Sequence, residues 1–302
     1  MAGMKQQVLG FEESAPQARA LAAALKCDYA TVSVHRFPDG ESLVTVPVKL
    51  RKTVLFYRSL NDPNAKLVEL LLAIEAARRH GCKRVVLIAP YLSYMRQDME
   101  FKPGQAVSQH IIGGLLSEWV DDLVTVDPHL HRTPRLSSVL PYCSSVARSA
   151  APLLGAFLRQ QQIQDTAVLV GPDAESRQWV EQVAQACGLD FVIAGKERFG
   201  DRAVKVTLPA YNYQDRHAIL VDDVISSGKT LVETTQALRN AGIRQVDALC
   251  THALFAPGAE ESLREAGIRH VWSTSSIPQT TSCIDLTPVL VEGLHELLGE
   301  PR

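Results

Sequence analysis

The residues with the clearest chemical meaning lie in His217–Thr230, which reads HAILVDDVISSGKT. An apolar run leads into two adjacent carboxylates, Asp222 and Asp223, and then into two serines, a glycine and a helical pattern. This order predicts a buried strand, a tight turn and a helix N-terminus, which attracts anions because its first N–H groups have no partner within the helix. Such a segment suits a sugar phosphate, with the acids on the hydroxyls and the turn amides on the phosphate. Plain helix capping is the alternative, and a nucleotide P-loop is excluded because Asp223 stands where that loop requires glycine.

Two further polar clusters follow predicted strands in the first half of the chain. Arg96, Gln97 and Asp98 come shortly after the apolar run 84–89. A guanidinium suits phosphate, while an amide or a carboxylate suits a base edge or a ribose hydroxyl. His129 follows the next apolar run and suits a metal ligand or a general base. A solvated loop and a surface histidine are the structural alternatives.

The second half of the chain places an acid, Asp173, and two cations, Lys196 and Arg198, after apolar runs. The Gly-Pro pair before Asp173 stiffens the turn, so its carboxylate is presented in one direction, either to a metal ion or as a helix cap. Lys196 and Arg198 begin a polar stretch that ends at Arg202. We expect a flexible basic loop there that closes over phosphates, with a solvated β-turn as the alternative.

A short aromatic and acidic segment, Phe37-Pro-Asp39-Gly-Glu41, lies between two strand patterns. Its Asp-Gly pair predicts a hairpin turn. Phe37 is unusually apolar for a hairpin tip, so it either packs internally or stacks on a base.

The elements that must position these residues are short apolar runs alternating with helical patterns. The predicted strands are 31–36, 53–57, 84–89, 123–126, 167–170, 191–194, 218–221, 246–251 and 270–273. The predicted helices lie near 15–25, 64–80, 106–119, 151–162, 176–187, 230–242, 258–267 and 287–299. This alternation indicates an α/β fold with mainly parallel sheets covered on both faces. Ligands of such sheets bind beyond the carboxyl ends of the strands, which is where the polar clusters fall.

The two halves of the chain echo each other, since Val85–Pro90 and Ala167–Pro172 are both apolar runs closed by a small residue and proline. A chain of 302 residues is long enough for two domains. We therefore predict an N-terminal domain over 1–145 and a C-terminal domain over 146–302, joined within the irregular segment Pro134–Ala151.

Composition excludes several classes of protein. A formal net charge of -2 gives no reason to expect nucleic acid as a partner. We find neither a signal-peptide pattern nor an apolar run of membrane-spanning length, so no membrane is expected. The six cysteines are scattered without a C-x-x-C pair, which favours reduced thiols and a cytoplasmic location.

Taken together, the polar clusters resemble those of the ribose-phosphate diphosphokinases (phosphoribosyl diphosphate synthases), in the same order and spacing. The matching segments are Phe37–Glu41, Tyr94–Asp98, Val126–His129, Gly171–Asp173, Lys196–Arg198, Val221–Thr230, Thr251–Phe255 and Ser273–Pro278. The resemblance implies two tandem phosphoribosyltransferase-type domains, each a mainly parallel sheet flanked by helices. It also implies that the last helix packs near the first domain.

The resemblance implies a role for each cluster. The ATP-binding residues would be Phe37, Asp39 and Glu41, reaching into a neighbouring subunit, and Arg96, Gln97 and Asp98. The magnesium-site residues would be His129 and Asp173, and the catalytic loop residues would be Lys196 and Arg198. The ribose 5-phosphate residues would be Asp222 and Asp223 for the hydroxyls and Ser226, Ser227, Gly228, Lys229 and Thr230 for the phosphate.

The implied activity is magnesium-dependent transfer of the β,γ-diphosphoryl group of ATP to the C1 hydroxyl of ribose 5-phosphate, giving phosphoribosyl diphosphate and AMP. The implied assembly is a homo-oligomer with a dimer as its minimum unit. A phosphoribosyltransferase that uses the same loop and a catalytically weak or regulatory homologue are the alternatives. Ser226 replaces an acid that many members carry, and Lys229 replaces a common small residue, adding a positive charge beside the expected 5-phosphate.

Overall fold

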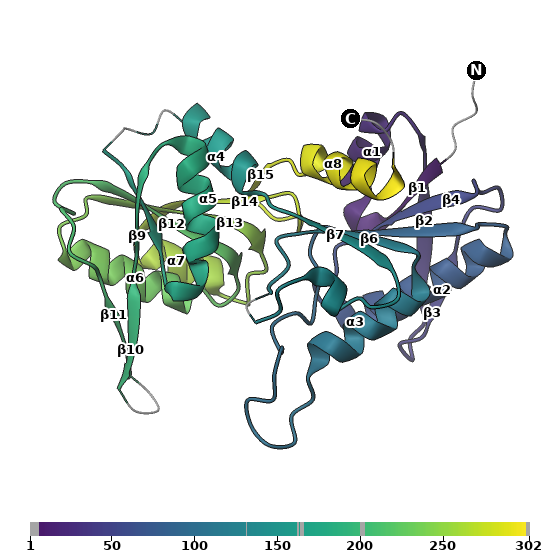
Figure 1. Cartoon of the computed structure of the whole chain (residues 1–302), viewed down its shortest axis with the longest axis horizontal. Coiled ribbons are helices and arrows are strands. Elements are labelled where there is room, and N and C mark those ends of the chain that lie inside the picture. The colour runs from purple at the N-terminus through teal and green to yellow at the C-terminus, as the bar shows by residue number, and fades with distance from the viewer. Residues whose placement is uncertain (1–5, 131, 162, 164–165, 200–202, 300–302) are drawn as a thin grey trace. The chain divides into compact units, whose positions relative to one another are not determined.

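The computed structural model describes residues 6–130, 132–161, 163, 166–199 and 203–299, without the side chains of 196–199 and 203–205. Its Cα packing separates two compact units, one formed by 1–149 with 286–302 and the other by 150–285 (Figure 1). The units differ from the predicted ranges 1–145 and 146–302 mainly at the last helix, which belongs to the first unit.

The first unit contains a seven-stranded sheet in the order β3-β2-β1-β4-β5-β6-β7. Its strands are β1 (Gln6–Phe11), β2 (Asp28–Arg36), β3 (Ser42–Thr45), β4 (Thr53–Tyr57), β5 (Arg84–Ala89), β6 (Asp122–Val126) and β7 (Ser144–Arg148). Neighbouring strands are parallel except for the antiparallel pair β2 and β3.

Helices cover both faces of this sheet (Figure 1). Helices α1 (Ala15–Ala24) and α8 (Thr287–Leu298) lie on one face, and α2 (Pro63–Arg79) and α3 (Ser108–Trp119) on the other. Two short 3-10 turns, Glu12–Ser14 and Leu136–Ser138, complete the unit. The central strands are almost entirely buried because their apolar side chains meet helices on both sides, with Leu55, Phe56 and Leu87 among the fully buried residues.

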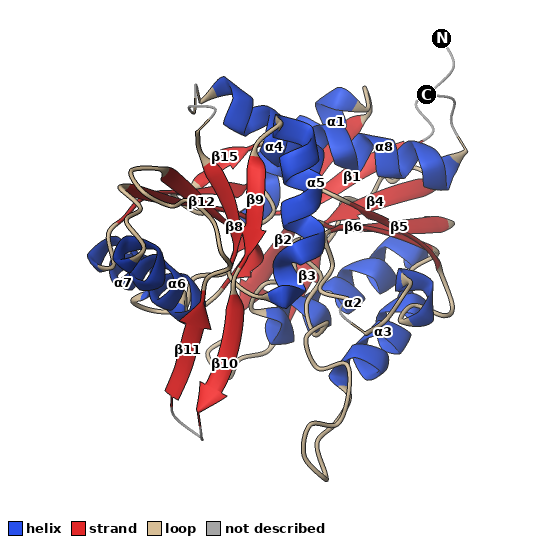
Figure 2. Cartoon of the chain, turned by 60° about the vertical axis from the view of Figure 1, so that its left-hand side comes forward, coloured by secondary structure: helices blue, strands red, loops and turns tan. Residues whose placement is uncertain are grey.

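The second unit contains a six-stranded parallel sheet in the order β15-β14-β13-β12-β8-β9. Its strands are β8 (Val168–Gly171), β9 (Asp190–Ile193), β12 (His217–Ile225), β13 (Gln245–Ala253), β14 (Ile268–Thr274) and β15 (Ser282–Ile284). Helices α4 (Ala151–Gln160) and α5 (Arg177–Cys187) lie on one face, and α6 (Lys229–Asn240) and α7 (Ala259–Glu265) on the other (Figure 2). A 3-10 turn, Ala174–Ser176, precedes α5.

The predicted fold class is confirmed, because each unit is a mainly parallel sheet flanked by helices. The predicted helices and strands are present with shifts at their ends, and the hairpin predicted from Asp39-Gly40 joins β2 to β3. No helix in the described part of the chain is long and apolar enough to cross a membrane.

Two segments were predicted wrongly. Pro134–Ala151 was expected to be irregular, but it contains β7, an edge strand in which only Val146 is buried, so no apolar run marks it. The expected flexible loop from Lys196 begins instead as β10 (Gly195–Phe199), which pairs with β11 (Ala203–Thr207) in an antiparallel ribbon. This ribbon is separate from the main sheet and therefore lacks the apolar pattern of a buried strand.

Candidate functional site

The predicted site residues are divided between the two units, which we describe separately. In the first unit, β5 and β6 are parallel neighbours, so the segments that follow them leave the sheet at the same edge. In the second unit, β8 and β12 are parallel neighbours and the same argument holds for their carboxyl ends. The residues at these strand ends therefore occupy the position where open α/β sheets bind ligands.

The hairpin tip Phe37–Glu41 is exposed and is held mainly by its own backbone. The Phe37 N–H donates to the Glu41 carbonyl at 2.8 Å, and the Gly40 N–H donates to the Phe37 carbonyl at 3.0 Å. Gly40 has a φ of +94°, a conformation that a side chain disfavours. Phe37 remains 42% exposed with its ring edge-on to His35, so it is available to a planar ligand rather than packed internally.

The segment after β5 is held in place by a glutamine that the sequence did not single out. Gln109, fully buried on α3, donates from its side chain to the Met95 carbonyl at 3.0 Å, and its backbone N–H donates to the Gln97 carbonyl at 3.2 Å. Thr133 in turn donates to the Gln109 side-chain oxygen at 2.8 Å. A polar residue on a helix shows no pattern of its own, so only its tertiary contacts identify it.

The side chains of the next cluster, Arg96, Gln97 and Asp98, differ in how many hydrogen bonds they already make within the protein. Asp98 has a side chain only 3% exposed, and Arg132 Nη1 donates to both of its carboxylate oxygens, at 3.0 and 3.2 Å. The Gln97 amide makes only long contacts of 3.5 Å, to the Met99 carbonyl and to the Gln105 side chain. Arg96 is exposed and has no side-chain partner among the described residues. Arg96 and Gln97 are thus available to a ligand, whereas Asp98 orients Arg132.

His129 lies half-buried three residues beyond β6. The chain turns sharply before it, at Asp127, which is buried and has a φ of +37°. The Asp127 N–H donates to the Arg148 carbonyl at 2.9 Å, which fixes this turn against β7. The position of His129 is therefore set by a strained, well-bonded turn, as expected for a residue with a positional role.

In the second unit, β12 continues beyond the strand beside it. Its pairing with β8 ends at Leu220↔Val170, whereas its pairing with β13 continues to Ile225↔Ala253. Asp222 and Asp223 therefore lie within β12 but past the end of β8, and not beyond the strand as the sequence had indicated.

The electrostatics of this strand end are unfavourable in the protein alone. Burial raises the pKa of Asp222 well above its ordinary value, and the nearby carboxylates of Asp223 and Asp173 raise it further. The Asp223 N–H donates to Asp222 Oδ1 at 3.0 Å and partly offsets this effect. A bound cation or a set of hydroxyl donors would relieve the clustered negative charge.

Asp173 acts as a helix cap in the structure, since its Oδ1 accepts the Ser176 N–H at 3.2 Å. It also lies near enough to Asp222 to perturb that carboxyl group. A carboxylate can accept more than one interaction, so the two interpretations made from the sequence, capping and metal binding, are compatible. Gly171 closes the turn, because a Cβ there would lie 2.4 Å from Ser176 Oγ.

The turn from Ser226 to Thr230 ends in a helix N-terminus, as predicted. Gly228 is the N-cap of α6, with a φ of +71°, and has no side chain to cap the first N–H groups. A Cβ at this position would lie 3.0 Å from Leu263 Cδ2. Backbone N–H groups at such an end are suited to an anion. Ser227 and Lys229 are exposed at the same turn.

The two predicted catalytic cations lie on β10, where Lys196 is the register partner of Val206 and Arg198 that of Val204. Their side chains, and residues 200–202, lie outside the described residues.

The carboxylates fit a magnesium ion better than the histidine does. Mg²⁺ prefers oxygen ligands and is usually held by one or two carboxylates together with substrate phosphates and water. Asp173 and Asp222 supply such oxygens, and their carboxylates lie close enough together that Asp173 raises the pKa of Asp222. No group of three or more His, Cys, Asp or Glu side chains that could hold a metal ion occurs within the described ranges. This donor set suits an ion that arrives with a phosphate ligand.

Comparison with known proteins identifies the family. Residues 6–119 match the N-terminal domain of ribose phosphate pyrophosphokinase, and residues 147–282 match the phosphoribosyl transferase domain. A ribose-phosphate pyrophosphokinase of Methanopyrus kandleri is 34% identical over 295 residues, covering 97% of this chain and 99% of the relative. The corresponding protein of Sulfolobus acidocaldarius is 33% identical over 259 residues, covering 84% and 87% of the two chains.

A solved structure supports the same fold. The crystal structure of phosphoribosylpyrophosphate synthetase from Mycobacterium smegmatis superposes with a TM-score of 0.83, covering 99% of this chain and 100% of that one at 22% identity. Its similarity in fold extends to both units, and the second unit is of the phosphoribosyltransferase type. With matches over nearly its whole length, the chain belongs to the ribose-phosphate pyrophosphokinase family.

Proposed function

We propose that this protein is a ribose-phosphate diphosphokinase, which transfers the β,γ-diphosphoryl group of ATP to ribose 5-phosphate. The observation that carries the proposal is the similarity over 97% of the chain to a relative named ribose-phosphate pyrophosphokinase. In the reaction, the C1 oxygen of the sugar attacks the β-phosphorus. The bond from this phosphorus to the bridging oxygen of the α-phosphate breaks, AMP leaves with that oxygen, and the C1 hydroxyl proton passes to solvent.

The nucleotide would bind to the first unit. Exposed Phe37 offers its ring to the adenine, with Asp39 and Glu41 beside it on the hairpin tip. Arg96 and Gln97 offer a guanidinium and an amide to the nucleotide, and Asp98 holds Arg132 in position near them.

The sugar phosphate would bind to the second unit. The paired carboxylates Asp222 and Asp223 would accept hydrogen bonds from the ribose hydroxyls, which would stabilise their negative charge. The 5-phosphate would lie at the N-terminus of α6, where Ser226, Ser227 and Thr230 add hydroxyls and Lys229 a positive charge.

Magnesium, bound with the substrate phosphates, would neutralise the charge of the triphosphate. Asp173 is the proposed oxygen ligand in the second unit, and His129 of the first unit is the other proposed magnesium-site residue, although a nitrogen ligand is unusual for this ion. Lys196 and Arg198 would stabilise the charge that develops during transfer. Loss of one such cation typically lowers turnover about 100-fold or more, and we expect this for Lys196→Ala and Arg198→Ala.

One assay tests the proposed activity. The purified protein is incubated with ATP, ribose 5-phosphate and Mg²⁺, and AMP and phosphoribosyl diphosphate are measured. We expect both products in equal amounts, and none when EDTA is present. Pyrophosphate formation from phosphoribosyl diphosphate and a nucleobase would instead indicate a transferase, and ATP binding without AMP would indicate a regulatory homologue. Other pentose phosphates, tested on the wild type and on Lys229→Ala, show whether Lys229 broadens the sugar specificity.

The proposed homo-oligomer, with a dimer as its minimum unit, has its own test. If the hairpin tip completes the ATP site of a neighbouring subunit, Phe37→Ala and Arg96→Ala each weaken every ATP site when alone, whereas mixing the two kinds of subunit forms some sites that carry neither substitution. We expect activity at low ATP concentration to rise above that of either variant after the two are dissociated and reassembled together. Mass spectrometry confirms that mixed oligomers have formed. If activity does not rise in them, the tip and Arg96 belong to the same subunit's site.

A further inference from the structure

The hairpin that carries Phe37 is tied at its stem by one buried carboxylate. Arg36 and Ser42 are register partners at the point where β2 ends and β3 begins. Arg36 Nε donates to Glu69 Oε1 at 2.8 Å, and Ser42 Oγ donates to the same oxygen at 3.1 Å. Glu69 lies on α2 with its side chain fully buried. A single oxygen atom thus joins both strands of the hairpin to the helix beneath them.

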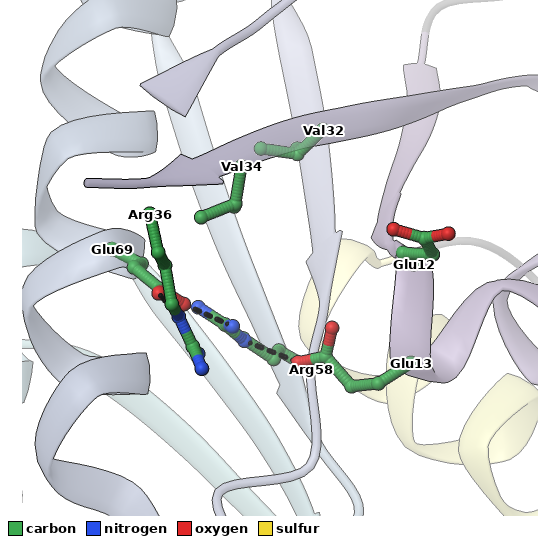
Figure 3. Close-up of a pocket in the computed structure, with 7 residues that line it drawn as sticks. All are labelled: Glu12, Glu13, Val32, Val34, Arg36, Arg58 and Glu69. Carbon is green, nitrogen blue, oxygen red and sulfur yellow. Dashed lines mark hydrogen bonds and ion pairs between the residues drawn. The ribbon is translucent and has the colours of Figure 1, made fainter. Parts of the chain in front are cut away.

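The other oxygen of Glu69 is held from the side of the sheet. Arg58, which follows β4 and is 2% exposed, donates from Nη2 to Glu69 Oε2 at 2.5 Å. The remaining guanidinium bonds run to Glu13 Oε1 at 2.8 Å and to the Lys66 carbonyl at 3.0 Å. Figure 3 shows Arg58 lying between Glu69 and Glu13, with Arg36 approaching Glu69 from β2. Because rotation of Arg58 would leave a buried charge unpaired, Arg58 fixes the Glu69 carboxylate.

The Glu69 carboxylate remains ionised in this position. Burial by itself raises its pKa, but hydrogen bonds from Arg36 and Arg58 outweigh burial, and the pKa lies below its ordinary value. The pKa of Arg36 is raised mainly by its hydrogen bond to Glu69. The stem contact is therefore a charge-assisted bond on a rigid support.

The Glu69 contact holds the outermost pair of the hairpin ladder, beyond the packing of Val34 and Val44 against the core. Strand β3 is at the edge of the sheet, and its ladder with β2 has four residue pairs, from Ser33↔Thr45 to Arg36↔Ser42. A two-stranded hairpin of this length is only marginally stable by itself. The tip from Phe37 to Glu41 is exposed, so its orientation is set at the stem.

We propose that Glu69 and Arg36 are positioning residues for the nucleotide, because they fix the direction in which the hairpin presents Phe37, Asp39 and Glu41. This inference rests on the function proposed above. Neither residue is required to touch ATP, and the network lies in the first unit, whereas the carboxylates Asp222 and Asp223 belong to the second unit. Disruption of the network should therefore weaken the binding of ATP without weakening that of ribose 5-phosphate.

The test compares two variants with a matched control. Glu69→Gln keeps the shape of the side chain but leaves only one acceptor oxygen. It therefore cannot accept hydrogen bonds from Arg58 and from the hairpin stem at the same time. Arg36→Gln leaves the buried Arg58, Glu69 and Glu13 contacts intact, so it tests the inference even if Glu69→Gln does not fold. Asp28→Asn is the control, because it breaks an exposed ion pair with Arg51 at the far end of the same strand. We expect the KM for ATP to rise about tenfold or more in both variants, with the KM for ribose 5-phosphate and the control unchanged.

A double-mutant cycle with Phe37→Ala separates positioning from direct contact. If Arg36 acts by placing the ring of Phe37, Arg36→Gln should lose most of its effect on the KM for ATP once the ring has been removed. An undiminished effect in the Phe37→Ala background would overturn the proposal, as would wild-type ATP affinity in Arg36→Gln. An equal rise of both KM values would overturn it too, since that outcome indicates general damage. Lack of AMP formation by the wild type would refute the proposed activity, a result distinct from all of these.

Discussion

The carboxylate pair Asp222 and Asp223 on β12 should lower the free energy of unfolding of the protein. The substitution Asp222→Asn tests this, because it should raise that free energy. Asp222 lies beside buried Asp223 and near Asp173, and burial together with these neighbours raises its pKa. Asparagine has the same shape and keeps a carbonyl oxygen where Oδ1 accepts the Asp223 N–H at 3.0 Å. The substitution therefore removes the charge and little else.

The sign and size of the effect follow from this geometry. A carboxyl group whose pKa is raised on folding favours the folded state only while it is protonated, and this contribution is lost as pH rises through the folded-state pKa. Asp222→Asn should thus match the wild type near pH 4 and become progressively more stable as pH rises. We expect a gain of about 1–2 kcal/mol at pH 8, the range seen when a strained functional group is neutralised. This corresponds to an increase of about 3–8 °C in the unfolding temperature of the second unit.

The measurement is thermal unfolding in EDTA between pH 4 and pH 8, without substrates. Tryptophan fluorescence reports the second unit through Trp179 and Trp272, with Trp119 of the first unit replaced by Phe in both proteins. The same substitution should weaken ribose 5-phosphate binding about 10- to 100-fold, because a hydrogen bond to a charged acceptor is lost. Equal or lower stability of the variant at pH 8, or a difference that does not vary with pH, would refute the electrostatic reasoning.

Three more substitutions or modifications test other parts of the molecule. Gly228→Ala should lower the free energy of unfolding by about 1–2 kcal/mol, because Gly228 has a left-handed φ of +71° and a Cβ there would press on Leu263. The same substitution should raise the KM for ribose 5-phosphate. Calorimetry and kinetics measure the two effects, and an unchanged KM would contradict the assignment of this turn to the phosphate. Burial raises the pKa of Asp247, but His217 at 2.8 Å and Arg269 at 3.1 Å outweigh burial, so the pKa lies below its ordinary value. Asp247→Asn should therefore lower the free energy of unfolding, measured in urea at pH 7, by about 3 kcal/mol. That cost should shrink below pH 4, where the wild type loses the same contribution, and a loss independent of pH would contradict the ion-pair explanation. Burial, with Asp122 and Asp121 nearby, raises the pKa of Cys143 to about 12, so iodoacetamide at pH 8 should label it only after unfolding, and mass spectrometry of the native protein checks this.

Much of the fold follows from local patterns in the sequence. Most of the central strands and the helices were predictable because apolar residues recur at the spacing of a buried strand or of a helix face, although β1 was not among the predicted strands. The strand-end clusters could be found for the same reason, since a chain that leaves a parallel sheet does so at its carboxyl edge. The hairpin at Asp39-Gly40 required only knowledge of turn chemistry.

Strands without an apolar run escaped this reasoning. β7 is a polar edge strand, and β10 and β11 form a ribbon apart from the main sheet, so none of the three contains a continuous apolar run. These strands form because a partner strand lies beside each of them, β6 beside β7 and β11 beside β10, and this neighbourhood exists only in the folded chain.

By itself the sequence determined which residues could do chemistry and which elements carry them. Only the tertiary structure decided which of these residues are free, which are already bonded, and what supports them. Asp98 is paired with Arg132, 34 positions away, and the hairpin stem is held by Glu69, 33 positions from Arg36. Contacts of this kind join polar residues on separate elements, where no spacing rule relates one partner to the other. They form because a buried charge must find a partner in three dimensions, and the folded chain alone specifies which one it finds.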